Sequence, residues 1–254
     1  MNSKAGWSDD LTKLHESAAG AGISIDVYSR DCGIKALEGR IPADASILEL
    51  GSSSGFMLND IRKSFPRSTI TGSDFLPDVV ERLRSISSER IATIDITSND
   101  LPDCSHDAVV ALNVFEHIDD DEEAAREVFR ILKSGGIFYM EVPGGPTLYD
   151  AYDASLMHFR RYTRRSVRNL LLGAGFRLIE QSAIGFLAYP GFWATKKLNR
   201  LRFGISPNEN LVRQSIHDAA ESRLLSASIK LERRMRRFLT LPVGIRQTAT
   251  AIKP

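Results

Sequence analysis

The segment from Ser46 to Phe56 constrains the fold of this chain more than any other stretch. Ile47, Leu48 and Leu50 form a nearly continuous apolar run, which is typical of a strand buried on both faces of a parallel sheet. Small and flexible residues follow at positions 51–55, and a helical pattern begins at Phe56. A strand, a glycine-containing turn and a helix in succession allow a ligand to approach bare backbone at a helix N-terminus.

The turn matches a known pattern. Positions 49–55 read Glu-Leu-Gly-Ser-Ser-Ser-Gly, which resembles motif I, E-x-G-x-G-x-G, of the class I S-adenosylmethionine-dependent methyltransferases. Ser53 stands where the motif has its middle glycine. The nicotinamide-binding fingerprint G-x-G-x-x-G needs a different glycine spacing and is absent. The resemblance implies that S-adenosylmethionine is the cofactor and that Glu49, Gly51, Ser53 and Gly55 contact it.

The next two predicted strands also end at candidate cofactor residues. Positions 68–74 read as the second strand, and an acidic residue at its end can accept hydrogen bonds from ribose hydroxyls, which gives this role to Asp74. Phe75 could pack on the adenine, whereas an N-cap role before the following helix is the alternative for Asp74. Positions 91–96 read as the third strand. There Asp95 resembles the residue that reads the adenine amino group, with Ile96 beside the ring, although Asp95 could instead cap a turn.

A second motif follows the fourth predicted strand, at positions 107–113. The run Asn-Val-Phe-Glu-His-Ile from Asn113 to Ile118 resembles motif IV in the N-x-x-E-H-I form of the small-molecule branch. Asn113 is therefore a further cofactor candidate. Together with the run R-I-L-K-S-G-G-I-F before a fifth strand, these motifs resemble methyltransferases of type 11/12 over positions 47–183.

This resemblance implies an α/β fold. We expect a Rossmann-like seven-stranded sheet of order 3-2-1-4-5-7-6, with strand 7 antiparallel and helices on both faces. Residues 1–40 would form N-terminal helices, at 9–19 and 25–37, and residues 41–254 the methyltransferase domain. A sixth strand at 176–184 and a seventh at 245–252 leave residues 185–242 as a basic helical insertion or lid, in which 215–239 reads as one helix.

Methyl transfer to oxygen requires a group that removes a proton from the acceptor. His117 and His158 are the candidate general bases because a histidine titrates near neutral pH, and Glu116 completes the catalytic set. The alternative is that Glu116 and His117 only orient the loop and the cofactor. The same three residues resemble part of the ligand set of metal-dependent relatives. Those relatives have a glutamate where this chain has Asn113, and we therefore predict no metal.

The acceptor is expected to meet the long segment between positions 143 and 162. The candidate substrate-binding residues there are Tyr149, Tyr152, Arg160, Arg161 and Tyr162. Arginine forks match phosphate and carboxylate groups. A small-molecule acceptor, including a sugar-linked or lipid-linked one, fits this set, and methylation at oxygen is the predicted reaction.

The net charge of +1 conceals a strong asymmetry. Residues 1–157 carry 14 Lys and Arg against 27 Asp and Glu, whereas residues 158–254 carry 19 against 5. The basic, aromatic-bearing insertion could rest on an anionic membrane or could simply be solvated. Two widely separated cysteines and a polar N-terminus lead us to expect a cytoplasmic protein, with possible peripheral contact at the inner face of the membrane.

Two other functions remain open from the sequence. The basic C-terminal half could serve an RNA methyltransferase or an RNA-binding protein, but nucleic acid is the less favoured partner because no stacking-aromatic repeat is apparent. A non-catalytic regulator that binds S-adenosylmethionine is the other alternative, which the serine at position 53 and the asparagine at position 113 leave open. The sequence does not indicate an oligomeric state.

Overall fold

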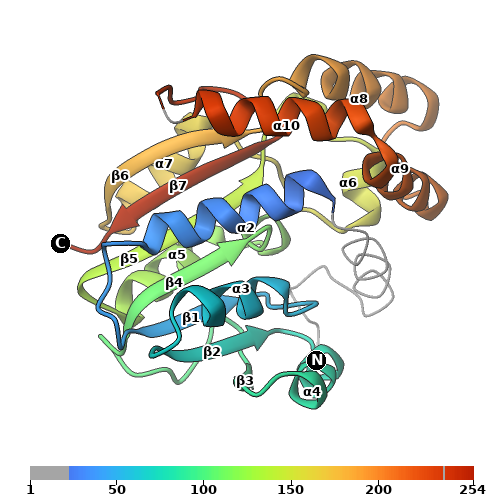
Figure 1. Ribbon diagram of the computed structural model, residues 1–254. Helices are drawn as coiled ribbons and strands as arrows, with labels where there is room; N and C mark the ends of the chain where they lie inside the picture. The colour runs from blue at the N-terminus through green and yellow to red at the C-terminus, as the bar shows by residue number, and fades with distance from the viewer. Residues whose placement is uncertain (1–22, 237) are drawn as a thin grey trace.

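The computed structural model describes residues 23–236 and 238–254 (Figure 1). Within these residues, seven strands form one sheet of the predicted order 3-2-1-4-5-7-6. β7 runs antiparallel to both of its neighbours, as predicted. The strands, in their order across the sheet, are β3 (Arg90–Thr93), β2 (Thr69–Asp74), β1 (Ser46–Leu50), β4 (His106–Leu112), β5 (Leu132–Pro143), β7 (Arg246–Ile252) and β6 (Arg177–Ile184).

Helices cover both faces of this sheet, with α2, α3 and α10 in front and α5 and α7 behind it in Figure 1. The predicted helix at 9–19 lies outside the described residues, whereas the one at 25–37 corresponds to α2. The helices are α2 (Ser24–Leu37), α3 (Phe56–Ser64), α4 (Pro77–Ile86), α5 (Asp121–Ile131), α6 (Ala151–Ser155), α7 (Arg164–Gly173), α8 (Tyr189–Phe203), α9 (Glu209–Glu221) and α10 (Arg223–Met235), with short 3-10 turns η1 (Phe115–His117) and η2 (Pro146–Leu148).

The core consists of two apolar layers, one on each face of the sheet. Successive strand residues point to opposite faces. Ile47 packs with the layer that includes α2, α3 and α4, whereas Leu48 packs with the layer that includes α5 and α7. Val110 and Val109 divide between the layers in the same way. Burial on both faces explains why the central strands read as continuous apolar runs.

Two elements differ from the sequence expectation by more than one residue. β3 ends at Thr93, so Asp95 and Ile96 lie in the following loop and not in a strand. The helix expected over 215–239 is two helices, α9 and α10, which meet at Ser222. The Ser222 hydroxyl accepts a hydrogen bond from the Leu225 amide at 3.1 Å and caps α10. A serine N-cap of this kind starts a new helix even though helical periodicity continues on both sides.

The segment at 143–162, which lacks clear periodicity, contains the short helix α6. Asp150 caps α6 in a capping box with Asp153. The insertion between β6 and β7 consists of α8, α9 and α10, as the fold prediction required. In Figure 1, α8 and α10 lie along the upper edge of the molecule, and α10 runs beside α2.

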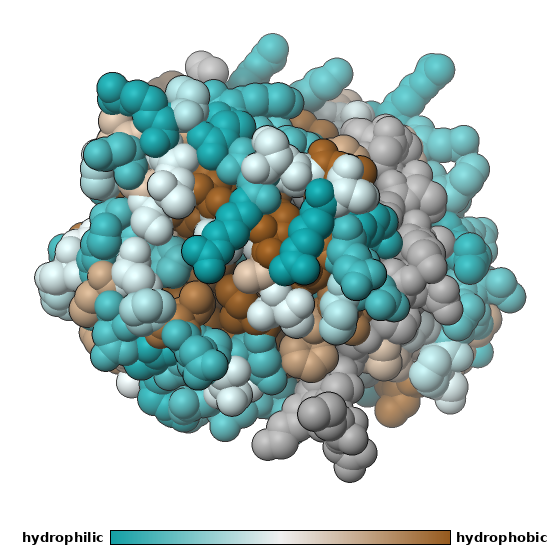
Figure 2. Space-filling model, turned by 90° about the horizontal axis from the view of Figure 1, so that it is seen from below, coloured by the Kyte–Doolittle hydropathy of each residue, from teal (hydrophilic) through white to brown (hydrophobic). Residues whose placement is uncertain are grey.

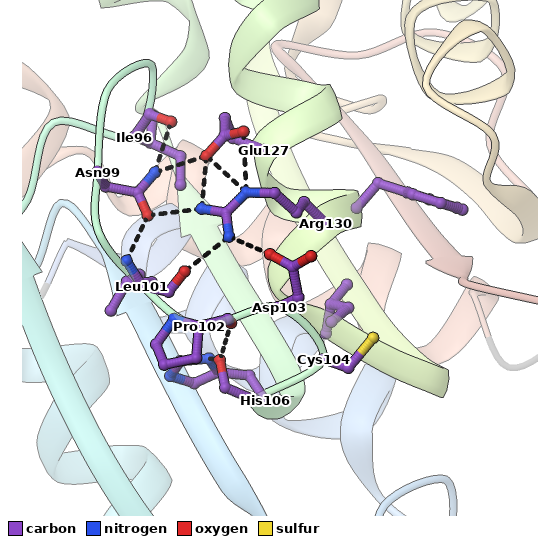
Figure 3. Close-up of polar contacts among 12 residues, drawn as sticks. Ile96, Asn99, Leu101, Pro102, Asp103, Cys104, His106, Glu127 and Arg130 are labelled. Carbon is purple, nitrogen blue, oxygen red and sulfur yellow. Dashed lines mark hydrogen bonds and ion pairs between the residues drawn. The ribbon is translucent and has the colours of Figure 1, made fainter.

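An arginine on α5 holds the loop between β3 and β4 (Figure 3). Arg130 donates hydrogen bonds to the Leu101 carbonyl oxygen and to an Asp103 carboxylate oxygen, both at 2.6 Å. It also donates to the Asn99 side chain at 3.1 Å, and Asn99 in turn donates to the Ile96 carbonyl oxygen at 3.1 Å. Through these contacts α5 fixes the loop that carries Ile96.

The face opposite the upper edge is largely hydrophilic. Figure 2 shows it from below, with apolar groups gathered near the middle and hydrophilic side chains around them. On α4, the apolar side chain of Ile86 is exposed, with 69% of its surface accessible. Single exposed apolar residues are normal on protein surfaces and need no partner.

Candidate cofactor and acceptor site

A cavity of about 1250 Å³ lies at the carboxyl ends of β1, β2, β3 and β4. In open α/β sheets this edge is where ligands bind. The insertion also contributes to the wall, through Phe192, Lys196 and Asn199 of α8 and Leu225 of α10. Sites for one small ligand measure roughly 300–1,000 Å³, so this cavity has room for a cofactor and a second molecule.

The turn after β1 has the backbone conformation that its glycines suggest. Gly51, Ser53 and Gly55 have φ values of 70°, 39° and 74°. A Cβ on Gly51 would lie 2.6 Å from Val114 Cγ2, so a side chain is excluded there. Ser53 adopts a left-handed conformation that favours glycine, which accounts for the glycine in motif I. Gly55 is the N-cap of α3 without a side-chain cap, so the helix N-terminus stays accessible to a ligand.

Asp74, at the end of β2, connects the loop after β1 with the loop after β2 through hydrogen bonds. Its carboxylate accepts hydrogen bonds from the Ser53 amide and from the Leu76 amide, both at 3.1 Å. Burial raises the pKa of Asp74, and these backbone donors oppose the rise. The neighbouring Phe75 also lines the cavity. The predicted N-cap alternative does not hold, because Leu76 is the N-cap of α4 and no side chain caps it.

Glu49 lies buried at the end of β1, where it lines the cavity. The Ser52 hydroxyl donates a hydrogen bond to its carboxylate at 2.9 Å. Burial raises the pKa of Glu49 to about 8, and the Ser52 bond opposes this rise. The side chain is therefore largely protonated at neutral pH.

The ends of β3 and β4 bring three more predicted residues to the cavity. Asp95 accepts hydrogen bonds from the Thr97 amide at 3.0 Å and from the Thr97 hydroxyl at 2.7 Å, which is turn-capping geometry. Ile96 is buried next to it and lines the cavity. Asn113 has a φ of 54°, and its side chain lies 3.4 Å from a Glu141 carboxylate oxygen.

Glu116 and His117 belong to the turn η1, which is separated from the end of β4 by two residues. Glu116 is fully buried, and neither of its carboxylate oxygens has a hydrogen-bond partner among the described residues. Burial raises the pKa of Glu116 to about 8, so its protonated form dominates at neutral pH. The His117 ring meets the His158 ring edge-on, with 4.6 Å between the ring centroids.

His158 forms a pair with a carboxylate that the sequence reasoning missed. His158 Nδ1 lies 3.0 Å from an Asp153 carboxylate oxygen, and both side chains are buried. Burial lowers the pKa of His158, and the Asp153 contact opposes this effect. The imidazole is therefore neutral at pH 7. If its Nδ1 carries the hydrogen toward Asp153, its Nε2 is left as a proton acceptor.

Two buried cations keep Asp153 ionised. Arg161 donates to its carboxylate at 2.8 Å, and Lys196 of α8 donates at 2.9 Å. The pKa of Asp153 lies far below its ordinary value, because the contacts with His158, Arg161 and Lys196 outweigh burial. Lys196 also donates to Asp150 at 2.6 Å and lies 4.6 Å from the centroid of the Tyr152 ring.

The five predicted substrate-binding residues do not gather in the cavity. Tyr152 and Arg161 line it, but Tyr149, Arg160 and Tyr162 do not. Tyr162 is buried in the core, and its hydroxyl lies 2.6 Å from an Asp121 carboxylate oxygen. Arg160 also binds Asp121, at 2.7 Å, and the Tyr149 hydroxyl donates to the His158 carbonyl oxygen at 2.7 Å. These three side chains therefore hold the loop and do not face the acceptor space.

Lys196 and Arg246 lie at the site although their positions in the sequence did not predict it. Lys196 looked like one of several solvent-facing basic residues of the insertion, and it is in fact buried. Arg246 of β7 lines the cavity and binds Glu141 at 2.9 Å and also Asp26 of α2. The one local signal is the capping box of α6, which marks Asp153 as an ordered side chain.

Glu116, His117 and His158 could hold a metal ion. One ligand atom from each residue lies within 4.8 Å of those of the other two. An imidazole pair with one carboxylate suits zinc or a related transition metal better than magnesium. An ion there would favour the ionised form of Glu116, whose side chain is otherwise protonated at neutral pH. The prediction of no metal rested on Asn113 and remains untested by this geometry.

A methyltransferase domain model matches residues 48–140. This interval runs from β1 into β5 and includes both motifs described above. No helix among the described residues is long and apolar enough to cross a membrane.

Curated and solved proteins resemble this chain over different lengths. A Mycolicibacterium smegmatis protein assigned as an S-adenosylmethionine-dependent methyltransferase is 30% identical over 54% of this chain and 53% of its own length. A malonyl-[acyl-carrier protein] O-methyltransferase of Bacillus cereus is 26% identical over 62% of this chain and 61% of its own length. The chain thus spans about half to three fifths of these relatives.

A solved structure extends the fold comparison to nearly the whole chain. A protein of Galdieria sulphuraria assigned as a sarcosine dimethylglycine methyltransferase superposes with a TM-score of 0.67 at 13% identity, covering 96% of this chain and 98% of its own. The seven-stranded topology, the two motifs and these relatives agree. The glycine turn that excludes a side chain, in a cavity sized for two molecules, also fits S-adenosylmethionine, the cofactor named for the Mycolicibacterium smegmatis relative. Residues 48–140 match a methyltransferase domain family, and the chain is similar to S-adenosylmethionine-dependent methyltransferases in sequence and to methyltransferases in fold.

Proposed function

We propose that this chain transfers a methyl group from S-adenosylmethionine to an oxygen atom of a small-molecule acceptor, with His158 as the general base. The observation that carries the proposal is the buried pair of His158 and Asp153 at the cavity wall, 3.0 Å apart. A neutral imidazole oriented by an ionised carboxylate is a common general-base arrangement.

The glycine turn and its neighbours would hold the cofactor. When bound, S-adenosylmethionine supplies a methyl group on an activated sulfonium. Gly51 and Gly55 leave room for it at the start of α3, and Asp74 would accept the ribose hydroxyls. Phe75 and Ile96 would pack on the adenine, and Asp95 would accept from its amino group.

The other half of the cavity would hold the acceptor. Its wall there includes Tyr152, Leu156, Phe192 and Leu225, so an apolar portion of an acceptor would be well accommodated. The charge of Arg161 is taken up by Asp153, which argues against the phosphate-binding role expected from the sequence. We therefore favour an acceptor with an apolar part, such as a lipid-linked molecule, over one that is recognised through phosphate.

The proton would move from the acceptor hydroxyl to His158 Nε2. The positive charge that forms on the ring would be stabilised by Asp153, which Arg161 and Lys196 keep ionised. Glu116 is protonated at neutral pH and could donate a hydrogen bond to the acceptor oxygen. Its neighbour His117 would limit the movement of the His158 ring through the edge-on contact.

A metal-assisted reaction is the second candidate, because Glu116, His117 and His158 lie within ligand range of one another. A bound ion would lower the pKa of the acceptor hydroxyl directly. Removal of metal with EDTA would then abolish turnover, and added zinc would restore it. Turnover that survives exhaustive chelation leaves the general-base reaction.

The test compares His158→Gln with the wild-type protein. Binding of S-adenosylmethionine is measured by titration calorimetry, and transfer of labelled methyl is measured across fractionated extracts. We expect unchanged cofactor affinity with turnover lower by about 10²–10⁴-fold, the usual effect of removing a general base. Because the pKa of His158 is lowered, wild-type turnover should fall only at acidic pH. Near-normal turnover of the variant would refute the role of His158, and cofactor binding without turnover in any extract would favour a non-catalytic regulator.

A further inference from the structure

The outward face of α8 is apolar and basic, although its inward face belongs to the cavity wall. Trp193, Lys197 and Leu201 follow one another at a spacing of four residues, which puts them on one side of the helix. Leu201 is 85% exposed, and Trp193 is also exposed. Lys196, in contrast, is buried against Asp150 and Asp153.

The outward face of α10 has the same character. Leu224 and Leu231 are two helical turns apart and both are exposed, Leu224 to 82%. The inward face carries Ile229, which packs in the core on the side of α2. Phe238, seven residues beyond Leu231, is 86% exposed. An apolar inner face suffices to fix a helix on a domain, so the fold does not account for the outer leucines.

Basic side chains flank these apolar groups. The segment 185–242 carries 11 Lys and Arg against 4 Asp and Glu. Two of the arginines are engaged elsewhere, since Arg233 binds Asp31 and Arg236 lies against Cys32 and Thr248. Among the described residues, no carboxylate forms an ion pair with the exposed cations of this segment, which are Arg200, Arg202, Arg213, Arg223, Lys230 and Arg234.

We propose that the outward faces of α8 and α10 dock this protein on an anionic lipid bilayer. Exposed leucine, phenylalanine and tryptophan enter the interface between headgroups and acyl chains, while the flanking cations meet the acidic headgroups. A second copy of the chain is the less suitable occupant, because a two-fold contact would put two surfaces of like charge together. A nucleic acid would use the cations but leave the leucines without a partner.

The position of these helices connects the docking surface to the cavity. α8 contributes Phe192 and Asn199 to the wall, and α10 contributes Leu225. A molecule held in the bilayer would therefore meet the same two helices that enclose the acceptor space. The docking itself does not depend on methyl transfer, so it can be tested without any turnover measurement.

The test is co-sedimentation of the full-length protein with vesicles. Vesicles of phosphatidylglycerol and phosphatidylcholine are compared with phosphatidylcholine alone, at low and at high salt. The chain has two tryptophans, Trp7 and Trp193, so a Trp7→Phe background lets the fluorescence of Trp193 report on insertion. We expect binding only to the anionic vesicles, loss of binding at high salt, and a blue shift of the Trp193 emission.

Two variants and a control separate the contributions. Leu224→Ser with Leu231→Ser should weaken binding at least about tenfold, by removing apolar groups from the interface. Replacing Arg223, Lys230 and Arg234 by glutamine should weaken it roughly a hundredfold, since each cation contributes separately. Ile86→Ser is the matched control, because Ile86 is exposed on α4, far from the insertion in Figure 1.

Three outcomes would overturn the proposal. The first is no binding to anionic vesicles at low salt. The second is equal binding by the leucine variant and the Ile86→Ser control. The third combines two observations: the leucine variant has a lower melting temperature, and the wild-type protein binds no vesicles. These leucines would then pack on another part of the chain or on a second copy. Circular dichroism and calorimetry with S-adenosylmethionine establish that each variant is folded.

Discussion

Replacing Lys196 by methionine would test whether the buried ion pairs of Lys196 with Asp150 and Asp153 stabilise the packing of α8 against the site. The Lys196 ammonium is buried and lies 2.6 Å from an Asp150 oxygen and 2.9 Å from an Asp153 oxygen. Methionine keeps most of the apolar stem and removes only the charged end. Asp153 retains Arg161 at 2.8 Å, so the main consequence falls on Asp150, which would lose its cation.

The expected loss of unfolding free energy depends on whether Asp150 becomes protonated when Lys196 is removed. Leaving one partner of a buried pair without its counter-charge costs about 3–5 kcal/mol of unfolding free energy. Asp150 can avoid this by taking up a proton, starting from an ordinary pKa of 3.8. At 1.36 kcal/mol for each pH unit, that proton costs about 4 kcal/mol at pH 7 and about 2 kcal/mol at pH 5. We therefore expect a loss of about 3–4 kcal/mol at pH 7.

The sign of the pH dependence is fixed by the same argument. Burial already raises the pKa of Asp150 above its unfolded value in the wild-type protein, where Lys196 opposes the rise, and loss of Lys196 raises this pKa further. Stability is then greatest at low pH and is lost as the pH rises toward that raised value. The difference in unfolding free energy between the variant and the wild-type protein should therefore be about half as large at pH 5 as at pH 7.

Urea unfolding followed by circular dichroism at both pH values measures these differences. Lys197→Met is the matched control, because Lys197 is the next residue of α8 and its ammonium lies 3.3 Å from the Thr147 carbonyl oxygen at the surface. The control should change the free energy of unfolding by less than about 0.5 kcal/mol. A loss below about 1 kcal/mol for Lys196→Met, equal at the two pH values, would refute the buried ion pair.

Three further changes test the cofactor side and the buried acid. Asp74→Ala should weaken S-adenosylmethionine binding by roughly 1–3 kcal/mol in titration calorimetry, and unchanged affinity would remove Asp74 from the site. Gly51→Val should abolish cofactor binding, because its Cβ would meet Val114 at 2.6 Å, while Gly39→Val, with a φ of 69° and open space, should leave affinity intact. The pKa of Glu116 is about 8, well above the ordinary 4.5, so its contribution to stability is full below pH 4.5 and is lost as the pH rises through 8. Glu116→Gln should therefore reduce the fall in unfolding free energy between pH 6 and 8, and an unchanged fall would contradict the raised pKa.

The sheet could be predicted because local and global signals agree in it. The strand at Ser46–Leu50 reads as apolar on both faces and ends in a turn whose glycines have a specific backbone role. The spacing from that turn to Asp74 and to Asn113 follows from the repeated strand and helix units of the fold. β7 was predictable from its position after the insertion, which is a property of the superfamily and not of its own residues.

The acceptor side could not be predicted because its residues meet only in three dimensions. Lys196 reads as a surface lysine until α6 presents Asp150 and Asp153 to it across more than 40 positions of sequence. Arg160 and Arg161 are adjacent in sequence and look equivalent, yet Arg160 binds Asp121 at the start of α5 and Arg161 binds Asp153 at the cavity. Pairwise contacts of this kind leave no periodicity or motif in the sequence.

The contrast between Glu116 and Asp153 assigns the acid and the base of the proposed reaction. Both carboxyl groups are fully buried. Arg161 and Lys196 bind Asp153 and keep it ionised, whereas Glu116 has no hydrogen-bond partner among the described residues and its pKa is raised to about 8. Burial alone would protonate both, so the hydrogen bond with His158 and the two cations make the difference for Asp153. An ionised Asp153 then makes its partner His158 the better proton acceptor, and a protonated Glu116 is limited to donating a hydrogen bond.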